Sequence, residues 1–510
     1  MTAVSSVPAR TAPPPIGSAP PSPAGPIDDS RLAELRPPPE VPLARSRQIL
    51  AFSAREIEFV FRWRRELGEV FRFHGVIPGS PTITSHPDHA RSLFTANPKL
   101  VPSLTAESPL LPIVGPNSVL TANGARHLRQ RKLLLPPFHG EAIQRYMASI
   151  TDIVDREIDG WPVGRPVSLA PKMQAITLDV ITSGILGISG RPQPGTPEHG
   201  LVETIKRLTR LSTTPLAKLA EFRNLGHREA VGLQRRALGV INRHTYGLIE
   251  RRRADPDLDG REDILSLIMR AQTEDGEALS DHEVRDELLT LILAGFETTA
   301  NSLAWSWERL VRNPDPYAAL REGVRGDEDA DGHVERVILE TMRNRPVIPA
   351  LGRRVQAPWQ LGDYGVPAGR PITVSVLLVH HREDVYPDPF AYRPDRWLAR
   401  SGPSQDESAD DSPGRSVVKQ PDDPGDDQKG EAGRRTVVKP GTYEWIPFGG
   451  GTRRCLGAAL AMAEQRVVLR AMARRLDLEA VDPEPERAQH RNVTMIPGRG
   501  ARVIIRARRS

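Results

Sequence analysis

The sequence predicts a mainly α-helical protein with small β-sheets, and three patterns carry that prediction. The segment 281–312, "DHEVRDELLTLILAGFETTANSLAWSWERLVR", is the strongest helix, because Ser280 and Glu283 match a capping box and Pro314 blocks extension. At 1.5 Å per residue this helix would run roughly 48 Å, enough to cross a whole domain. A mostly helical stretch extends to about Arg343, and short alternating segments before and after it predict strands.

Length and composition set the broad class. The 510 residues suffice for a large core, and length alone favours two or three domains. The net charge of +5 is small, and basic runs alternate with acids, so nucleic acid is not the expected partner. No apolar stretch reaches the roughly 18 residues that span a bilayer, and the N-terminus lacks an apolar signal segment. We expect a cytoplasmic protein without a membrane anchor.

Two segments have an unusual composition: one precedes the expected domain and the other interrupts it. Residues 1–45 are rich in Pro, Ala and Ser, which predicts a disordered tail before a domain at 46–510. A disordered acidic insertion is expected at about 400–440, because nine acidic and six basic residues and no aromatic ones lie between 401 and 439. Within it, "GRSVVKQP" and "GRRTVVKP" are near copies, which indicates lengthening by local duplication.

The remaining elements are short. "EVFRFHGVIPGSPTITSHPDHA" (69–90) predicts a hairpin around a Pro-Gly turn, followed by a helix. A second helix is expected at about His333 to Asn344, ending before Pro346. "QLGDYGVPAGRPITVSV" (360–376) predicts two strands, and "NVTMIPGRGARVIIRAR" (492–508) predicts a C-terminal hairpin.

The only cysteine, Cys455, stands in "FGGGTRRCLG" (448–457). A single cysteine is most often a small buried apolar residue, and it excludes internal disulfides and metal sites built from several thiolates. Here, however, three preceding glycines permit positive φ and close approach to a flat ligand. The helical pattern that follows puts the sulfur at a helix N-terminus, which favours the metal-ligating thiolate. Arg453 and Arg454 add positive charge that would pair with carboxylates of the ligand.

This run resembles the haem-binding signature of the cytochrome P450 superfamily, the haem-thiolate monooxygenases, and the soluble bacterial members are the nearest match. The resemblance rests on Phe448, Gly451, Arg453, Cys455 and Gly457. It implies haem b between a long central helix and the cysteine loop, with Cys455 as the axial ligand of the iron. It also implies that Arg453 binds a haem propionate and that Phe448 packs beside the sulfur.

The long helix carries "AGFETT" (294–299), which is either a polar stripe or a site for oxygen chemistry. Ala294 and Gly295 would let the helix approach haem, and the Thr298 hydroxyl could bond back to the Ala294 carbonyl and open a groove. Glu297 offers a route for protons. The resemblance implies the acid–alcohol pair of the family, in which Thr298 orders a proton-delivering water and Glu297 relays protons.

Other candidate residues depend on the same resemblance. His127 and Arg131 share one helix face and either hold a haem propionate or form a basic surface. One arginine of "ALGRRV" is expected at the other propionate, with Arg353 favoured over Arg354. His380 and His381 are interpreted as packing at a strand end, since no ligand cluster accompanies them.

A further trio implied by the family is structural. Glu340 and Arg343 have the i,i+3 spacing of a helical ion pair, and "YRPDRW" supplies Arg396 as the third member. The resemblance implies that the trio stabilises the core behind the haem.

The resemblance, which covers about 46–510 apart from the insertion, implies insertion of oxygen from O2 into a hydrophobic small molecule. Electrons would come from a separate ferredoxin and reductase or flavin reductase, because neither a dinucleotide-binding Gly motif nor cysteines for a cluster are present. Arg466, Arg470 and Arg474 form either a docking patch for an acidic partner or a solvated face.

By analogy, the substrate pocket would be lined by 100–121, 201–222, 347–352, Ala294 and Thr298. Two alternatives stay open. A peroxide-driven enzyme of this fold would typically lack the acid–alcohol pair, and a non-catalytic haem sensor or carrier would need no proton relay.

Overall fold

The computed structural model describes residues 17–509 apart from 75–79, 109, 139–140, 189–191, 212–222, 225–226, 228, 274, 326–331, 399–436, 439–440 and 492. The predicted insertion at about 400–440 and the first 16 residues of the predicted tail therefore lie outside the described residues, except for Val437 and Val438. None of the described helices is long and apolar enough to cross a membrane.

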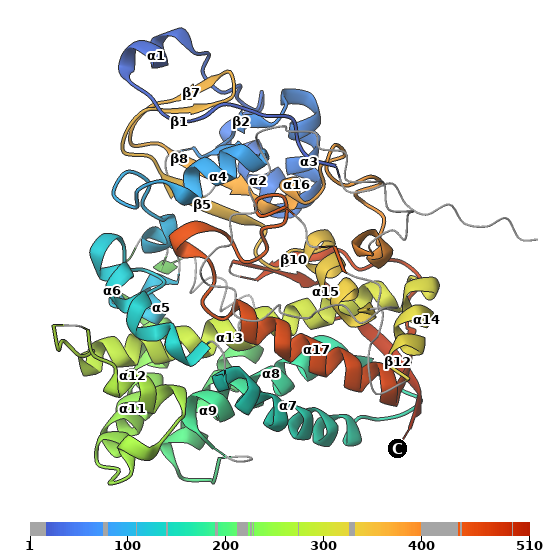
Figure 1. Ribbon diagram of the computed structural model, residues 1–510. Coiled ribbons are helices and arrows are strands. Elements are labelled where there is room, and N and C mark those ends of the chain that lie inside the picture. Colours follow the sequence, from blue (N-terminus) through green and yellow to red (C-terminus); the bar gives the residue numbers. More distant parts are fainter. Residues whose placement is uncertain are drawn as a thin grey trace, which may run out of the picture.

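Most helices lie in one half of the molecule, and most strands lie in the other together with the first four helices (Figure 1). The helices are α1 (Asp29–Glu34), α2 (Arg45–Ala54), α3 (Glu56–Leu67), α4 (Pro87–Thr95), α5 (Leu111–Val114), α6 (Gly124–Leu134), α7 (Glu141–Asp159), α8 (Leu169–Leu186), α9 (Pro197–Leu211), α11 (Gly232–Arg253), α12 (Ile264–Arg270), α13 (Asp281–Leu310), α14 (Pro314–Gly323), α15 (His333–Asn344), α16 (Val376–Val379) and α17 (Ala458–Arg475).

The long predicted helix is α13, which runs through the middle of the helical half with α8 and α17 packed beside it (Figure 1). Its capping box is present: the Glu283 N–H donates to Ser280 Oγ at 3.3 Å, and the Ser280 N–H donates to Glu283 Oε2 at 3.0 Å. Trp305 and Trp307 are fully buried, so the C-terminal half of α13 lies inside the hydrophobic core. The second predicted helix is confirmed as α15, with the predicted bounds.

The strands form four small sheets. Their orders are β1-β6-β7, β2-β3-β8-β5, β4-β12-β9 and β10-β11. The strands are β1 (Ala24–Pro26), β2 (Val70–Arg72), β3 (Thr82–Thr84), β4 (Pro166–Ser168), β5 (Ala350–Arg354), β6 (Trp359–Leu361), β7 (Tyr364–Val366), β8 (Pro371–Ser375), β9 (Leu476–Ala480), β10 (Ala488–Arg491), β11 (Thr494–Pro497) and β12 (Arg502–Arg508). The predicted first hairpin is confirmed, because β2 and β3 pair antiparallel and α4 follows.

Two strand predictions were wrong, the first in the number of strands and the second in their pairing. The segment 360–376 contributes to three strands, since β6 and β7 form a hairpin and β8 joins a different sheet. The C-terminal segment is not a hairpin, because β11 pairs with β10 whereas β12 pairs with β4 and β9. Val503 and Ile505 of β12 are buried against the helical core, and Met495 of β11 is buried in another cluster. Burial against distant segments determines the pairing partners of β11 and β12, and the local sequence pattern does not encode those contacts.

Residues 17–45 differ from the disorder expected for this part of the chain. Strand β1 pairs antiparallel with β6, and α1 follows it. His86 Nε2 donates to the Pro20 carbonyl at 2.8 Å, and Ser22 Oγ lies 2.9 Å from His89 Nε2. The segment is ordered by backbone and side-chain hydrogen bonds to α4 and β6, which its low apolar content did not predict.

Candidate functional site

The cysteine loop, residues 446–457, lies between β5 and the start of α17 (Figure 1). The Cys455 N–H donates to the Phe448 carbonyl at 2.9 Å and closes the loop. Gly449 and Gly451 have φ of 71° and 62°, as the sequence predicted, whereas Gly450 is extended. A Cβ at Gly451 would overlap the Phe94 carbonyl oxygen, so this glycine allows close packing of the loop on α4.

Cys455 lies two residues before Gly457, the N-cap of α17, which matches the predicted helix N-terminus. The residue is exposed by surface area, yet protein atoms crowd its thiol, and this desolvation raises the thiol pKa above the ordinary value. A hydrogen bond from the Gly457 N–H and the charges of Arg131 and Arg454 act in the opposite direction. The hydrogen bond and the charges at the helix N-terminus therefore oppose the effect of desolvation on the thiol pKa but do not outweigh it.

The predicted hydrogen bond of Thr298 within α13 is present. Thr298 Oγ1 donates to the Ala294 carbonyl at 2.7 Å, and Ala294 is exposed. Gly295 differs from the expectation that it faces a cofactor: a Cβ there would lie 2.6 Å from Ile181 Cδ1 of α8. Successive helical residues are rotated by about 100°, which turns Gly295 away from the Ala294 face and toward α8.

Glu297 has partners that the sequence analysis missed. Its Oε1 accepts from Arg491 Nε at 2.8 Å and lies 3.1 Å from Thr494 Oγ1, whose single proton is shared with the Arg491 carbonyl at 2.9 Å. Both donors belong to the hairpin β10–β11, nearly 200 residues further along the chain. No local pattern relates these positions, because strand pairing and helix packing bring them together.

Four predicted cofactor residues converge from three segments of the chain. Arg353 lies on β5 with its guanidinium 4.9 Å from the centre of the Phe94 ring. Arg453 follows the loop glycines and donates to the carbonyls of Val119 and Leu120, both at 3.3 Å. His127 and Arg131 lie on α6, as predicted.

The side chains of this basic cluster (His127, Arg131, Arg353 and Arg453) influence one another electrostatically. Burial, followed by the charges of the three arginines, lowers the His127 pKa to about 3. Burial also lowers the pKa of Arg353 and of Arg453 to about 10. Within the described part of the chain, no carboxylate forms an ion pair with Arg353 or Arg453. Buried cations of this kind favour an anionic ligand, so the donor set fits the two carboxylates of haem.

The choice between two neighbouring arginines follows from their contacts. Arg353 is buried, with 6% of its surface exposed, and takes part in the cluster. Arg354, the last residue of β5, instead forms an ion pair in which its Nη2 lies 2.6 Å from Glu107 Oε2. The structure thus brings Arg353 and not Arg354 to the cluster.

A loop that the sequence placed at the substrate pocket connects α13 to the cluster. The Val119 N–H donates to Glu287 Oε1 at 2.8 Å, while the Val119 carbonyl accepts from Arg453. Glu287 is fully buried, and desolvation raises its pKa well above the ordinary value. The sequence analysis also missed this residue, which looks like an ordinary acid in a charged helical turn.

The predicted Glu340–Arg343–Arg396 trio is a buried network. Arg343 Nε and Nη2 donate to the Glu340 carboxylate, each at 2.8 Å, and Arg396 Nε lies 3.0 Å from Glu340 Oε2. Arg343 also donates to the His380 carbonyl at 2.8 Å. His380 Nε2 accepts from the Ile446 N–H at 2.8 Å, which connects the network to the first residue of the cysteine loop. His380 and His381 are both buried.

Two of the three arginines of α17 have local partners. Arg466 Nε lies 2.6 Å from Glu335 Oε2 in an exposed ion pair. Arg474 Nε donates to the Val324 carbonyl at 2.7 Å.

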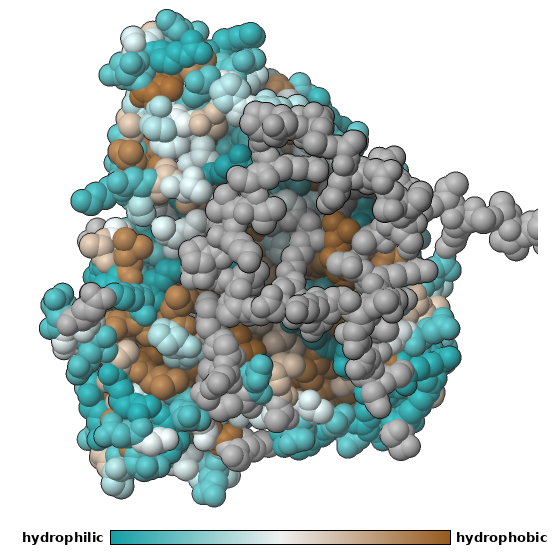
Figure 2. Space-filling view, in the orientation of Figure 1, coloured by the Kyte–Doolittle hydropathy of each residue, from teal (hydrophilic) through white to brown (hydrophobic). Residues whose placement is uncertain are grey.

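On the face shown in Figure 2, apolar side chains gather between α5 and α17, within a largely polar surround.

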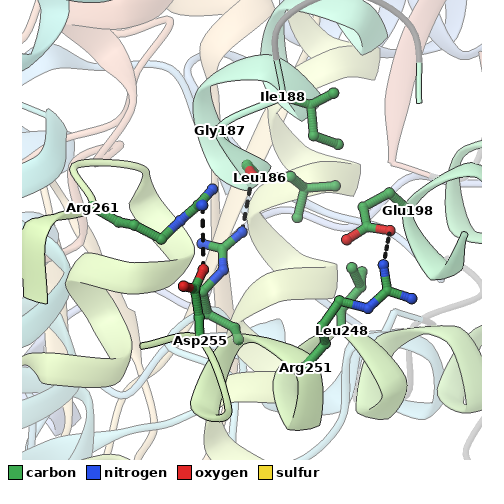
Figure 3. Close-up of a pocket in the computed structure, with 9 residues that line it drawn as sticks. Leu186, Gly187, Ile188, Glu198, Leu248, Arg251, Asp255 and Arg261 are labelled. Carbon is green, nitrogen blue, oxygen red and sulfur yellow. Dashed lines mark hydrogen bonds and ion pairs between the residues drawn. The ribbon is translucent and has the colours of Figure 1, made fainter. Parts of the chain in front are cut away.

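A separate pocket of about 150 Å³ lies between the end of α8, α9 and α11. Figure 3 shows its arginines turned toward acids: Arg251 lies 3.2 Å from Glu198, and Arg261 lies 3.3 Å from Asp255. None of the predicted site residues lines this pocket. Its charges are paired, so it contrasts with the basic cluster.

Comparison with known proteins decides the family. The family model described as cytochrome P450 matches residues 37–503. The chain belongs to the cytochrome P450 family. It is 33% identical over 476 residues to cytochrome P450 135B1 of Mycobacterium tuberculosis, covering 92% of each chain. It is 34% identical over 485 residues to cytochrome P450 138 of the same organism, covering 93% of this chain and 97% of that one.

The solved structures agree on the fold. The retinoic acid-bound cyanobacterial CYP120A1 superposes with a TM-score of 0.69 at 19% identity, covering 93% of this chain and all of that one. This P450 is therefore an oxidoreductase of the haem monooxygenase family, which binds iron protoporphyrin IX through a cysteine. Cys455 is its only cysteine.

Proposed function

We propose that this P450 inserts one oxygen atom from O2 into a hydrophobic organic substrate, with Cys455 as the axial ligand of the haem iron. The observation that carries the proposal is the bond of the Thr298 hydroxyl to the Ala294 carbonyl, one residue from Glu297. A haem protein that only carries or senses a ligand needs no threonine hydroxyl with an acid beside it on this helix.

The basic cluster binds the haem carboxylates. Arg353 and Arg453 each supply a charged fork, and His127 and Arg131 supply donors from α6. Phe448 packs beside the sulfur, and Gly451 and Gly457 keep the loop free of side chains on either side of Cys455. Burial strengthens each charge-assisted bond, because water competes poorly for the donors.

Thr298 and Glu297 manage protons. The bound haem–thiolate iron supplies the oxygen-activating chemistry. Because the Thr298 hydroxyl donates its hydrogen bond to the Ala294 carbonyl, the lone pairs of Oγ1 remain free to accept a hydrogen bond from a water molecule beside the helix. Glu297, on the same turn, exchanges protons between that water and solvent.

The substrate is hydrophobic and the electrons come from a separate redox protein. The loop around Val119 and the α13 face at Ala294 form two walls of the pocket, and the first of these is joined to Arg453. Residues 212–222, expected on a third wall, lie outside the described residues. Arg470 and the exposed edge of α17 are the proposed docking surface for the electron donor.

The test replaces Thr298 with alanine. In T298A we expect haem binding to persist while the product formed per electron consumed falls at least tenfold, within the range of general acid–base effects. Thr151→Ala is the matched control, because Thr151 Oγ1 makes the same bond to Met147 on the surface of α7. Equal product yields in T298A and T151A would refute the proton-relay role and favour a carrier or a peroxide-driven enzyme.

A further inference from the structure

The hairpin β10–β11 is fastened to α13 at two levels. At one level, Trp305 Nε1 donates to the Met495 carbonyl at 3.0 Å, and the Met495 N–H donates to the Val347 carbonyl at 2.7 Å. At the other level, about two helical turns away, Arg491 and Thr494 both bond to Glu297. Arg491 and Thr494 are themselves the closing pair of the hairpin.

The contact at Glu297 is strong for its position. The side chains of Arg491 and Glu297 are only 11% and 18% exposed, so their ion pair is less screened than a surface pair. Both bonds end on one carboxylate oxygen, Oε1. Oε2 takes part in neither bond and keeps lone pairs for exchanging a proton.

We propose that Arg491 and Thr494 are positioning residues for Glu297. They hold Oε1, fix the rotamer of the side chain and direct Oε2 for proton exchange beside Thr298. Without them the carboxylate is free to turn toward bulk solvent, and the C-terminal hairpin no longer controls proton supply. The inference rests on the proposed function, because it gives a structural cause for the orientation of the proton relay.

The first experiment tests the contact without relying on catalysis. Amide hydrogen exchange of β10 and β11 is measured in the wild-type holoenzyme, R491Q, E297Q and the double variant R491Q/E297Q. We expect each single variant to exchange at least threefold faster at the end of the hairpin, and the double variant to be no faster than either. Arg506→Gln is the control, because Arg506 forms an exposed pair with Glu479 on β12 and β9.

The second experiment asks whether the contact serves proton delivery. Product per electron and the solvent deuterium isotope effect on turnover are compared in wild type, R491Q, R491K, T494V and R506Q. We expect R491Q to lose about tenfold in product per electron with a larger isotope effect. The retained charge of R491K should restore most of the yield, T494V should show a smaller loss, and R506Q should match wild type.

The outcomes separate this inference from the proposed function. If wild type shows haem–thiolate absorption and R491Q has the wild-type yield and isotope effect, the positioning role is overturned. Unchanged hairpin exchange in E297Q overturns the contact itself. If wild type lacks haem–thiolate absorption, the proposed function fails, and the catalytic role of Arg491 fails with it.

Discussion

Two regions of this P450 bury arginines near the cysteine loop, and the partners of those arginines differ between the two regions. In the Glu340 network, Arg343 and Arg396 share one carboxylate and several carbonyls, all within the protein. In the basic cluster, Arg353 and Arg453 bond to carbonyls and an amide oxygen, without an acid among the described residues. The first arrangement is complete without a ligand and the second is completed by an anion, which separates a structural site from a binding site.

The largest effect on stability is expected in the Glu340 network, where the arginine charges already have a carboxylate partner. Replacing Glu340 with alanine leaves two buried guanidinium groups unpaired, so we expect the free energy of unfolding to fall by about 3–5 kcal/mol. Urea titration of the holoenzyme measures this. A loss below about 1 kcal/mol would contradict the view that this network is internally complete.

In the basic cluster we expect a small effect on stability and a large effect on haem affinity. Arg353→Gln should change the stability of the apoprotein little, because it removes a cation with no acidic partner. Haem affinity should fall by at least about tenfold, as expected for a lost charge-assisted bond. The comparison uses haem titration and urea unfolding of the same apoprotein preparations.

Arg354→Gln is the matched control for that experiment. Its exposed pair with Glu107 predicts a change within about 1 kcal/mol in stability and none in haem affinity. If R354Q loses haem and R353Q does not, the assignment of the propionate partner is reversed.

A smaller effect concerns pH. His127 is neutral in the fold, since burial and three arginine charges lower its pKa to about 3 from an ordinary value near 6.5. A lowered pKa means that the unfolded state binds more protons in this window, so the His127 contribution is present above pH 6.5 and is lost progressively as pH falls toward 3.

In R453Q one of the opposing charges is gone, so the His127 pKa should rise and the pH-dependent loss should shrink. Apoprotein unfolding between pH 7 and pH 4 and the His127 resonances in NMR measure both. An identical pH dependence in R453Q and R506Q would show that the cluster is not electrostatically coupled.

Much of this architecture was predictable, because its signals are local. The capping box of α13, the bounds of α15, the Thr298 back-bond and the positive φ of Gly451 each follow from residues within one or two helical turns. The cysteine signature and the order of the motifs indicated the family, which the comparisons confirmed.

The rest depends on contacts between distant segments. The pairing of β11 and β12 and the ordering of residues 17–45 were mispredicted, because a strand or a Pro-rich segment does not specify its partner locally. Gly295 was assigned to the wrong neighbour for the same reason, since α8 packs on that side of α13. The bonds of Arg491 and Thr494 to Glu297 were missed entirely.

The most direct test of the central claim is the absorption spectrum of the reduced holoenzyme under carbon monoxide, measured for wild type and for Cys455→His. The account predicts a Soret band shifted strongly to the red in wild type and the loss of that shift in C455H, with haem still bound by the basic cluster. A wild-type band typical of histidine ligation, or the same red-shifted band in C455H, would contradict Cys455 as the axial ligand.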